Sequence, residues 1–237
     1  MKKLICCILA ITCLTACFVS SSIPVYAVEN LSNIETARSG SIIPDAEGYA
    51  LSYTQLTNYN GVTEYGYINN WNNFRQYYTT DFNEYAYGNN CGPTQVANLL
   101  SYYKSVGYIH VFPNDIITQS FYTNTICDAT NYRTNIAMNL NDAANGFKEV
   151  FEDGADYYSV TISNELSLSW NNFKSLINSN KPLIISTQSH MYFVLGYQIR
   201  SGIKYYVCYT AWNNISERYA LIEYSTFYTN RKSITIN

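Results

Sequence analysis

Charged side chains are scarce in this chain of 237 residues, at 13% of the total, and Lys plus Arg number 14 against 17 Asp plus Glu. A net charge of -3 provides no basic field for a phosphate backbone, which excludes nucleic acid as an expected partner. The hydrophobic share of 47% and the aromatic share of 16% are too high for a disordered chain. The composition therefore predicts a folded domain with a sizeable core.

Long apolar runs are missing after the N-terminus, and no later run approaches the roughly 20 residues of a membrane-spanning helix. The first residues have the layout of an export signal, with a basic MKK, the apolar run LICCILAITCLTACFV, and SSSIPVYA before the cleavage site. We expect residues 1–27 to be a signal peptide, cleaved after Ala27, and the protein to be secreted. An alternative is a lipid anchor at the cell surface through Cys17, since LTAC resembles a lipobox. The apolar FV that follows Cys17 favours secretion.

Cysteine is rare outside the signal peptide, where only Cys91, Cys127 and Cys208 remain. An odd number of cysteines leaves at least one thiol unpaired within the chain. A disulfide between Cys127 and Cys208 would leave Cys91 free. No CxxC pair and no Cys/His cluster with zinc spacing occurs, so we expect no metal and no organic cofactor.

The periodicity along the chain predicts an α+β fold. Residues 28–75 are polar and irregular, and we interpret them as an N-terminal propeptide, a linker or a strand-bearing arm, followed by one domain at 76–237. Within the domain, helical spacing of apolar residues predicts helices at 91–107, 114–123, 131–147 and 168–180. Short β-branched and aromatic runs predict a strand at 157–163 and then strands at 182–188, 190–198, 204–212, 218–227 and 232–237. Helices followed by consecutive strands indicate an antiparallel C-terminal sheet.

Two residues of this fold are candidates for nucleophilic chemistry. Cys91 stands at a helix start in YGNNCGPTQVANLL, where the helix dipole stabilises a thiolate. His190 begins the predicted strand HMYFVLGY, and a neighbouring imidazolium would lower the thiol pKa further from its free value of about 8.5. Such a pair can attack a carbonyl and then protonate the leaving amine. The second histidine, His110 in GYIHVFP, is expected to be structural.

The stretches NNCGPTQVANLL, SHMYFVLGY and YYVCYTAW together resemble the papain-like cysteine peptidases. They are most similar to the bacterial branch related to bacteriocin-leader peptidases, which has a Cys-Gly-Pro helix start, a His-led strand and a later Trp-bearing strand. The resemblance covers roughly residues 80–237. It implies a nucleophile-bearing helix packed on the antiparallel sheet, with Cys91 as nucleophile, His190 as base and a polar third residue that orients the imidazole.

The third catalytic position departs from the pattern of the family. Papain-like enzymes carry Asn or Asp two residues before the Trp, and this chain carries Thr210 before Trp212. The Thr210 hydroxyl can accept a hydrogen bond from the imidazole. Asn213 is an alternative partner if the turn folds back.

The oxyanion position departs as well. The family places Gln six residues before the nucleophile, where this chain has Tyr85. We expect Asn89 or Asn90, together with the backbone N–H of Cys91, to polarise the scissile carbonyl. Asn90 is therefore also counted among the candidate catalytic residues.

The leading functional prediction is a secreted thiol hydrolase, namely a cysteine peptidase that acts on peptides or proteins through an acyl-enzyme on Cys91, with His190 as base. One alternative is a Cys-His acyl transferase or amidase, because these enzymes share the acyl-thioester chemistry. Another is a catalytically weak or inactive papain-like binding module, which Thr210 and Tyr85 favour. Residues 28–75 are a candidate occupant of the chain's own cleft.

Overall fold

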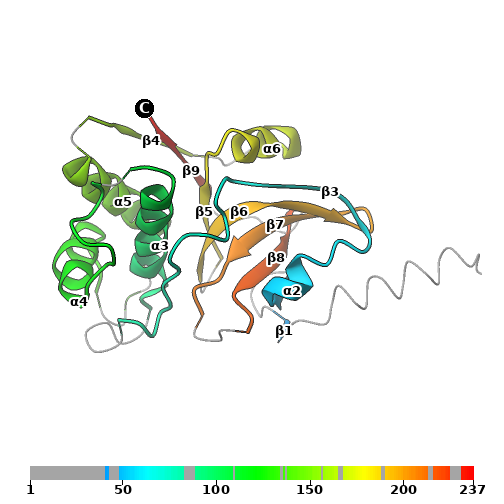
Figure 1. The fold of residues 1–237 in the computed structure, drawn as a ribbon, viewed down its shortest axis with the longest axis horizontal. Coiled ribbons are helices and arrows are strands. Elements are labelled where there is room, and N and C mark those ends of the chain that lie inside the picture. Colours follow the sequence, from blue (N-terminus) through cyan, green and yellow to red (C-terminus); the bar gives the residue numbers. More distant parts are fainter. Residues whose placement is uncertain are drawn as a thin grey trace, which may run out of the picture.

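The computed structural model describes residues 41–42, 48–82, 89–108, 110–133, 136, 138–155, 157–164, 168–187, 190–212, 216–224 and 231–237. The expected signal peptide, Tyr85 and Asn213 lie outside these residues. Within them, no helix combines the length and the apolar character needed to cross a membrane. Helices α3 (Cys91–Ser105), α4 (Gln119–Phe121) and α5 (Leu140–Gly154) gather on one side of the molecule, and most of the sheet lies on the other (Figure 1).

The described strands form one antiparallel sheet, in the order β1-β2-β8-β7-β6-β5-β9-β4, with β3 also paired to β6. Their bounds are β1 (Ser41–Ile42), β2 (Gly48–Leu51), β3 (Val62–Tyr67), β4 (Val160–Asn164), β5 (Leu183–Ser186), β6 (Met191–Arg200), β7 (Ile203–Tyr209), β8 (Tyr219–Glu223) and β9 (Arg231–Ile236). Each strand predicted from 157 onwards is confirmed, and so is the antiparallel arrangement.

Strand β6 is the centre of the sheet, and its side chains are buried at every position except Ile199. One edge pairs along nearly its whole length with β7. The other edge pairs with β5 at Met191–Val194 and with β3 at Gly196–Arg200. His190, directly before β6, is therefore attached to the strand with the most hydrogen-bonded neighbours.

The N-terminal arm is part of the sheet. Strand β2 pairs with β8, and β3 pairs with β6, although these partners lie more than 100 residues away in the chain. Helix α2 (Tyr53–Leu56) connects β2 to β3 and begins with a capping box between Ser52 and Gln55. Residues 48–67 thus belong to the same core as the predicted domain at 76–237. If these residues were removed as a propeptide, the edges of β8 and β6 with which they pair would be left unpaired.

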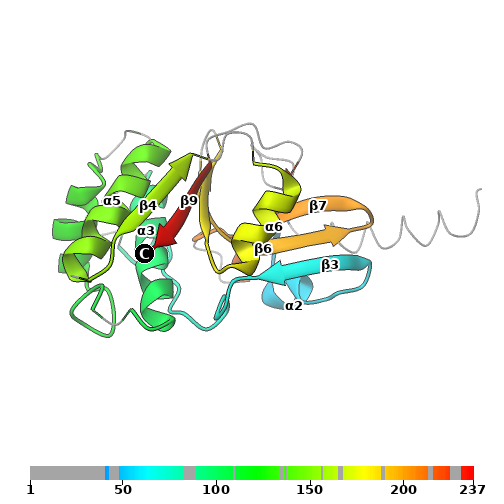
Figure 2. The ribbon, with the colours of Figure 1, turned by 90° about the horizontal axis from the view of Figure 1, so that it is seen from above.

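Helix α3 (Cys91–Ser105) runs between the sheet and helices α4 and α5, and its residues from Gly92 to Tyr103 are all buried (Figure 1). Helix α5 (Leu140–Gly154) packs along it through the aromatic contacts of Tyr103 with Phe147 and Phe151. Helix α6 (Trp170–Asn178) lies over β3 and β6 instead, as Figure 2 shows from above. The α+β fold with a helix packed on an antiparallel sheet is confirmed.

Two helix predictions differ from the structure. In the region 114–123, only α4 (Gln119–Phe121) is helical, and the chain continues as a π-helix over Tyr122–Cys127. In the region 131–147, the helix begins only at Leu140, because the Asn139 side chain caps it by accepting a hydrogen bond from the Asp142 N–H. The periodicity identified both helical regions but not their bounds.

Candidate active site

Cys91 is the first residue of α3, where the backbone N–H groups of a helix have no partner within the helix. Pro93 fits the first turn because it needs no N–H partner there. The backbone of Met191, of Gly92 and of Cys91 itself lies close enough to the sulfur to act on its pKa, which it lowers. The Met191 contact brings the sulfur to the residue directly after His190. The two candidate catalytic residues, separated by 99 positions in the sequence, therefore belong to one site.

The thiol of Cys91 is half-buried, while Cys127 and Cys208 are buried, and all three are free thiols. The disulfide considered between Cys127 and Cys208 does not form. Burial raises the pKa of the Cys91 thiol, and the backbone groups beside the sulfur only oppose this rise. The sequence prediction of a lowered pKa was wrong in direction, because packing against β6 removes the sulfur from water. The resting site favours a neutral thiol.

The His190 side chain is held in one orientation at the start of β6. Its Nε2 lies 2.6 Å from the backbone carbonyl oxygen of Thr210. Its ring packs edge-to-face on Tyr192, with the ring centroids 4.6 Å apart, and against Trp212 at 5.6 Å. A carbonyl oxygen can only accept, so Nε2 carries the hydrogen, and Nδ1 of the neutral ring carries the lone pair that a general base needs.

Thr210 contacts His190 through its carbonyl, whereas the sequence assigned that contact to its hydroxyl. The hydroxyl instead donates to the carbonyl of Arg218 at 3.1 Å and accepts from the N–H of Trp212 at 3.3 Å. The next residue, Ala211, has a φ of 57°, in the left-handed region that non-glycine residues rarely occupy. The backbone thus turns sharply where its carbonyl meets the imidazole.

The two asparagines before the nucleophile differ in their surroundings. Asn90 is buried, and its Nδ2 donates to the carbonyl of Thr79 at 2.7 Å. Asn89 is exposed, has a φ of 53° and makes no hydrogen bond with any described residue. The Asn90 amide therefore holds the segment around Thr79 against α3, while the Asn89 amide is accessible from the solvent.

Gln95 is a residue of the site that the sequence interpretation missed. It lies one helical turn after Cys91 and has no exposed surface. Its Nε2 donates to the carbonyl of Met191 at 3.0 Å and to the carbonyl of Tyr209 at 3.2 Å. These two carbonyls belong to the residue after His190 and the residue before Thr210. The place of Gln95 one helical turn after Cys91, on the same face of the predicted helix, was the signal in the sequence.

Gly92 permits a close approach beside the nucleophile. A Cβ at this position would lie 2.5 Å from Sδ of Met138 and 3.3 Å from Sδ of Met191. The two methionines therefore line the chain directly next to Cys91. Within the described residues, no group of three or more His, Cys, Asp or Glu side chains is arranged to hold a metal ion.

Comparisons with known proteins agree with the fold. The model of the Peptidase_C39 like family matches residues 68–235. Among solved structures, the crystal structure of UfSP from C. elegans is similar, with a TM-score of 0.52, 12% sequence identity, and coverage of 78% of this chain. The chain spans 36% of that structure's length, and the likeness concerns the fold. The comparison with curated proteins gives no match. The arrangement of helix and sheet and the match over most of the chain lead to one conclusion: the chain belongs to the Peptidase_C39 like family of papain-like cysteine peptidases.

Proposed function

We propose that the protein is an exported cysteine peptidase that cleaves peptide bonds through an acyl-enzyme on Cys91, with His190 as general base and then general acid. The observation that carries this proposal is the attachment of the nucleophile helix to the residue directly after His190, since Gln95, one turn after Cys91, donates to the Met191 carbonyl at 3.0 Å. It supports a direct approach of the thiol to the neighbouring imidazole. The Nε2 contact with the Thr210 carbonyl supports the tautomer in which Nδ1 accepts a proton.

In this mechanism the thiol stays protonated until the substrate binds, since burial raises its pKa. Nδ1 of His190 removes the proton as the sulfur attacks the scissile carbonyl carbon. The imidazolium then donates that proton to the leaving amine, the C–N bond breaks, and a thioester remains on Cys91. Water, deprotonated by the same imidazole, attacks the thioester, the C–S bond breaks, and the thiol regains its proton.

The negative charge on the tetrahedral oxygen needs hydrogen-bond donors. The backbone N–H of Cys91, at the positive end of α3, is one donor. Asn89 is a better candidate than Asn90 for the second, because the Asn90 amide already donates to Thr79 and the Asn89 amide is exposed. Losing one such donor typically lowers kcat by about 100- to 1,000-fold.

The proposed export of the protein and the proposed class of its substrate rest on different observations. The basic start, apolar run and V-x-A site in the first 27 residues support secretion after cleavage at Ala27, with a lipid on Cys17 as the alternative. Mass spectrometry of the exported protein distinguishes them, because secretion predicts an N-terminus at Val28 and anchoring predicts one at Cys17. Membership of a peptidase family supports a protein or peptide substrate.

Covalent capture tests the catalytic proposal. A peptide vinyl sulfone, which needs an activated thiol, is expected to label Cys91 in the folded protein and to lose this labelling in His190→Ala. Cys127→Ala is the matched control, since it removes a buried thiol and should leave labelling unchanged. A peptide library, read by mass spectrometry, then reports cleavage and its sequence preference.

The alternatives give different results in the same experiment. An acyl transferase or amidase would label in the same way and transfer the acyl group to an added amine rather than to water. A non-catalytic binding module would show equal labelling of Cys91 with and without His190, and no cleavage of the library. That last result would refute the proposal.

A further inference from the structure

The sequence contains two Asn-Gly pairs, Asn60–Gly61 and Asn145–Gly146. In such a pair the backbone nitrogen of the glycine can attack Cγ of the asparagine side chain, because glycine has no side chain that shields its nitrogen. The attack closes a five-membered succinimide ring and releases ammonia. Water then opens the ring to aspartate or to isoaspartate, in which the main chain runs through Cβ and Cγ. Whether a pair reacts depends on whether the folded structure lets the two atoms approach.

The pair Asn60–Gly61 lies in the turn between α2 and β3, and both of its residues are exposed. Among the described residues, neither the Asn60 side chain nor the Gly61 N–H has a hydrogen-bond partner. The turn is closed by the residues on either side, since the Val62 N–H donates to the Tyr59 carbonyl at 3.0 Å. The two atoms that must meet are therefore unrestrained and open to water.

The pair Asn145–Gly146 lies in the middle of helix α5, which holds it in place. Within a helix, the Gly146 N–H donates to the carbonyl four residues earlier. Gly146 is also buried, and a Cβ at this position would lie 2.5 Å from Cγ2 of Thr130. To reach Cγ of Asn145, the glycine nitrogen has to leave its helical hydrogen bond and separate this packing. The same dipeptide is therefore protected in the folded chain.

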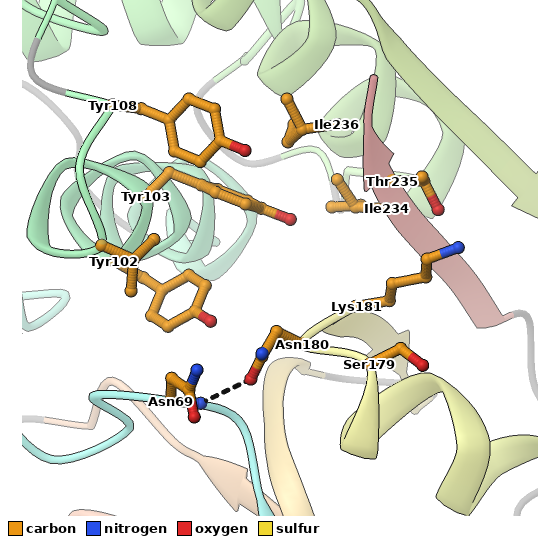
Figure 3. Close-up of a pocket in the computed structure, with 11 residues that line it drawn as sticks. Asn69, Tyr102, Tyr103, Tyr108, Ser179, Asn180, Lys181, Ile234, Thr235 and Ile236 are labelled. Atoms are coloured by element: carbon orange, nitrogen blue, oxygen red, sulfur yellow. Dashed lines mark hydrogen bonds between the residues drawn. The ribbon is translucent and has the colours of Figure 1, made fainter.

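Exposure in a turn is not sufficient for the reaction, as Asn180 illustrates. Asn180 is exposed in the turn after α6, and its Oδ1 accepts a hydrogen bond from the Asn69 N–H at 2.8 Å (Figure 3). The next backbone nitrogen, that of Lys181, donates to the Leu176 carbonyl at 2.9 Å. Both groups that would have to react are thus engaged in hydrogen bonds. Asn60 differs because its side chain and the next N–H are both free of such restraints.

We propose that Asn60 is a modification site, at which the folded protein deamidates spontaneously to isoaspartate and aspartate, and that Asn145 is protected. Isoaspartate lengthens the main chain by one atom directly before Gly61. The carbonyl of Gly61 accepts a hydrogen bond from the Ser201 N–H at 3.0 Å, which joins this turn to the turn after β6. Figure 2 shows β3 beginning where β6 ends. The longer main chain therefore loosens the start of β3 from the central strand and lowers stability.

Timed mass spectrometry tests the proposal. The full chain is incubated at mildly alkaline pH, folded in one series and unfolded in guanidinium chloride in the other, and is then digested at acidic pH. Fragmentation of the peptides locates each amide that has become a carboxylate. We expect Asn60 to react at a similar rate in both series. Asn145 should react at least about tenfold more slowly in the folded series, because α5 must first open locally and an opening cost of about 1.4 kcal/mol already reduces the rate tenfold.

The variant Asn60→Gln is the matched control, since its longer side chain would have to close a less favourable six-membered ring. We expect it to stay unmodified at this position and to keep its urea midpoint after incubation, while the converted parent unfolds at a lower urea concentration. Three results would each overturn the proposal. They are a folded-state rate at Asn60 tenfold below its rate in the unfolded chain, equal rates at Asn145 in both series, and an unchanged midpoint of the converted parent.

Discussion

Replacing Gln95 by leucine tests how the catalytic geometry is held together. The leucine fills a similar volume and removes the two hydrogen bonds to the carbonyls of Met191 and Tyr209, at 3.0 and 3.2 Å. Each such bond contributes about 1 kcal/mol net. The leucine also removes Oε1 of Gln95, which is buried without a hydrogen-bond partner among the described residues, and this offsets part of the loss. We expect a loss of about 1–2 kcal/mol of unfolding free energy.

The effect on activity should be larger than the effect on stability. Gln95 connects the helix that carries Cys91 to the strand ends next to His190 and Thr210. Without this connection the thiol and the imidazole are no longer held at a fixed separation, and a displacement of about 1 Å can lower the rate about 100-fold. We therefore expect kcat to fall by about 100-fold, with KM little changed, when the folded variant is assayed on a cleaved peptide from the library.

Gln198→Leu is the matched control. Gln198 is equally buried and belongs to β6, but its Nε2 donates to the Leu56 carbonyl at 3.1 Å and to the Tyr67 hydroxyl, far from the active site. This variant should lose at least as much stability in urea denaturation and keep its kcat. If Gln95→Leu and Gln198→Leu lose stability alike and both keep kcat, Gln95 only stabilises the fold and the reasoning is refuted.

Three further predictions concern stability measured by urea denaturation. Gly146→Ala should lower the free energy of unfolding by about 1–3 kcal/mol despite the better helix propensity of alanine, because the added Cβ would lie 2.8 Å from the backbone nitrogen of Thr130. An unchanged midpoint of urea denaturation would contradict this close packing. Ala211→Gly should raise the free energy of unfolding by about 0.5–1 kcal/mol, since the backbone φ of 57° at this position is strained for alanine. A lower free energy of unfolding would show that the turn is not strained. Burial raises the pKa of Cys208 well above its ordinary value, so above pH ~8.5 only the unfolded chain releases this proton, and stability should fall with rising pH. Cys208→Ala should reduce this slope by about 1.4 kcal/mol per pH unit, and an unchanged slope between pH 9 and 10 would disprove it.

Local patterns in the sequence determined the elements from Cys91 onwards. The helix beginning at Cys91 and the strands β5 to β9 were predicted because a spacing of 3.6 or 2 residues is visible within a single element. For the polar segment at 28–75 a strand-bearing arm was one interpretation, but the positions of strands β2 and β3 were not predicted. Their stability comes from pairing with β8 and β6, which lie far along the chain, so the segment itself carries little signal.

In the candidate site, too, some features could be predicted from the sequence and others depend on tertiary contacts. Cys91 and His190 were recognisable from their residue types and from the local structure around them. The contact of His190 with the Thr210 carbonyl, the raised thiol pKa and the connection through Gln95 depend on which distant groups meet the side chains. The sequence by itself determined which residues are candidates for the chemistry, because nucleophile and base are defined by functional groups. Only the tertiary structure decided their orientation and protonation, because burial and hydrogen bonding are set by neighbours about 100 residues away in the chain.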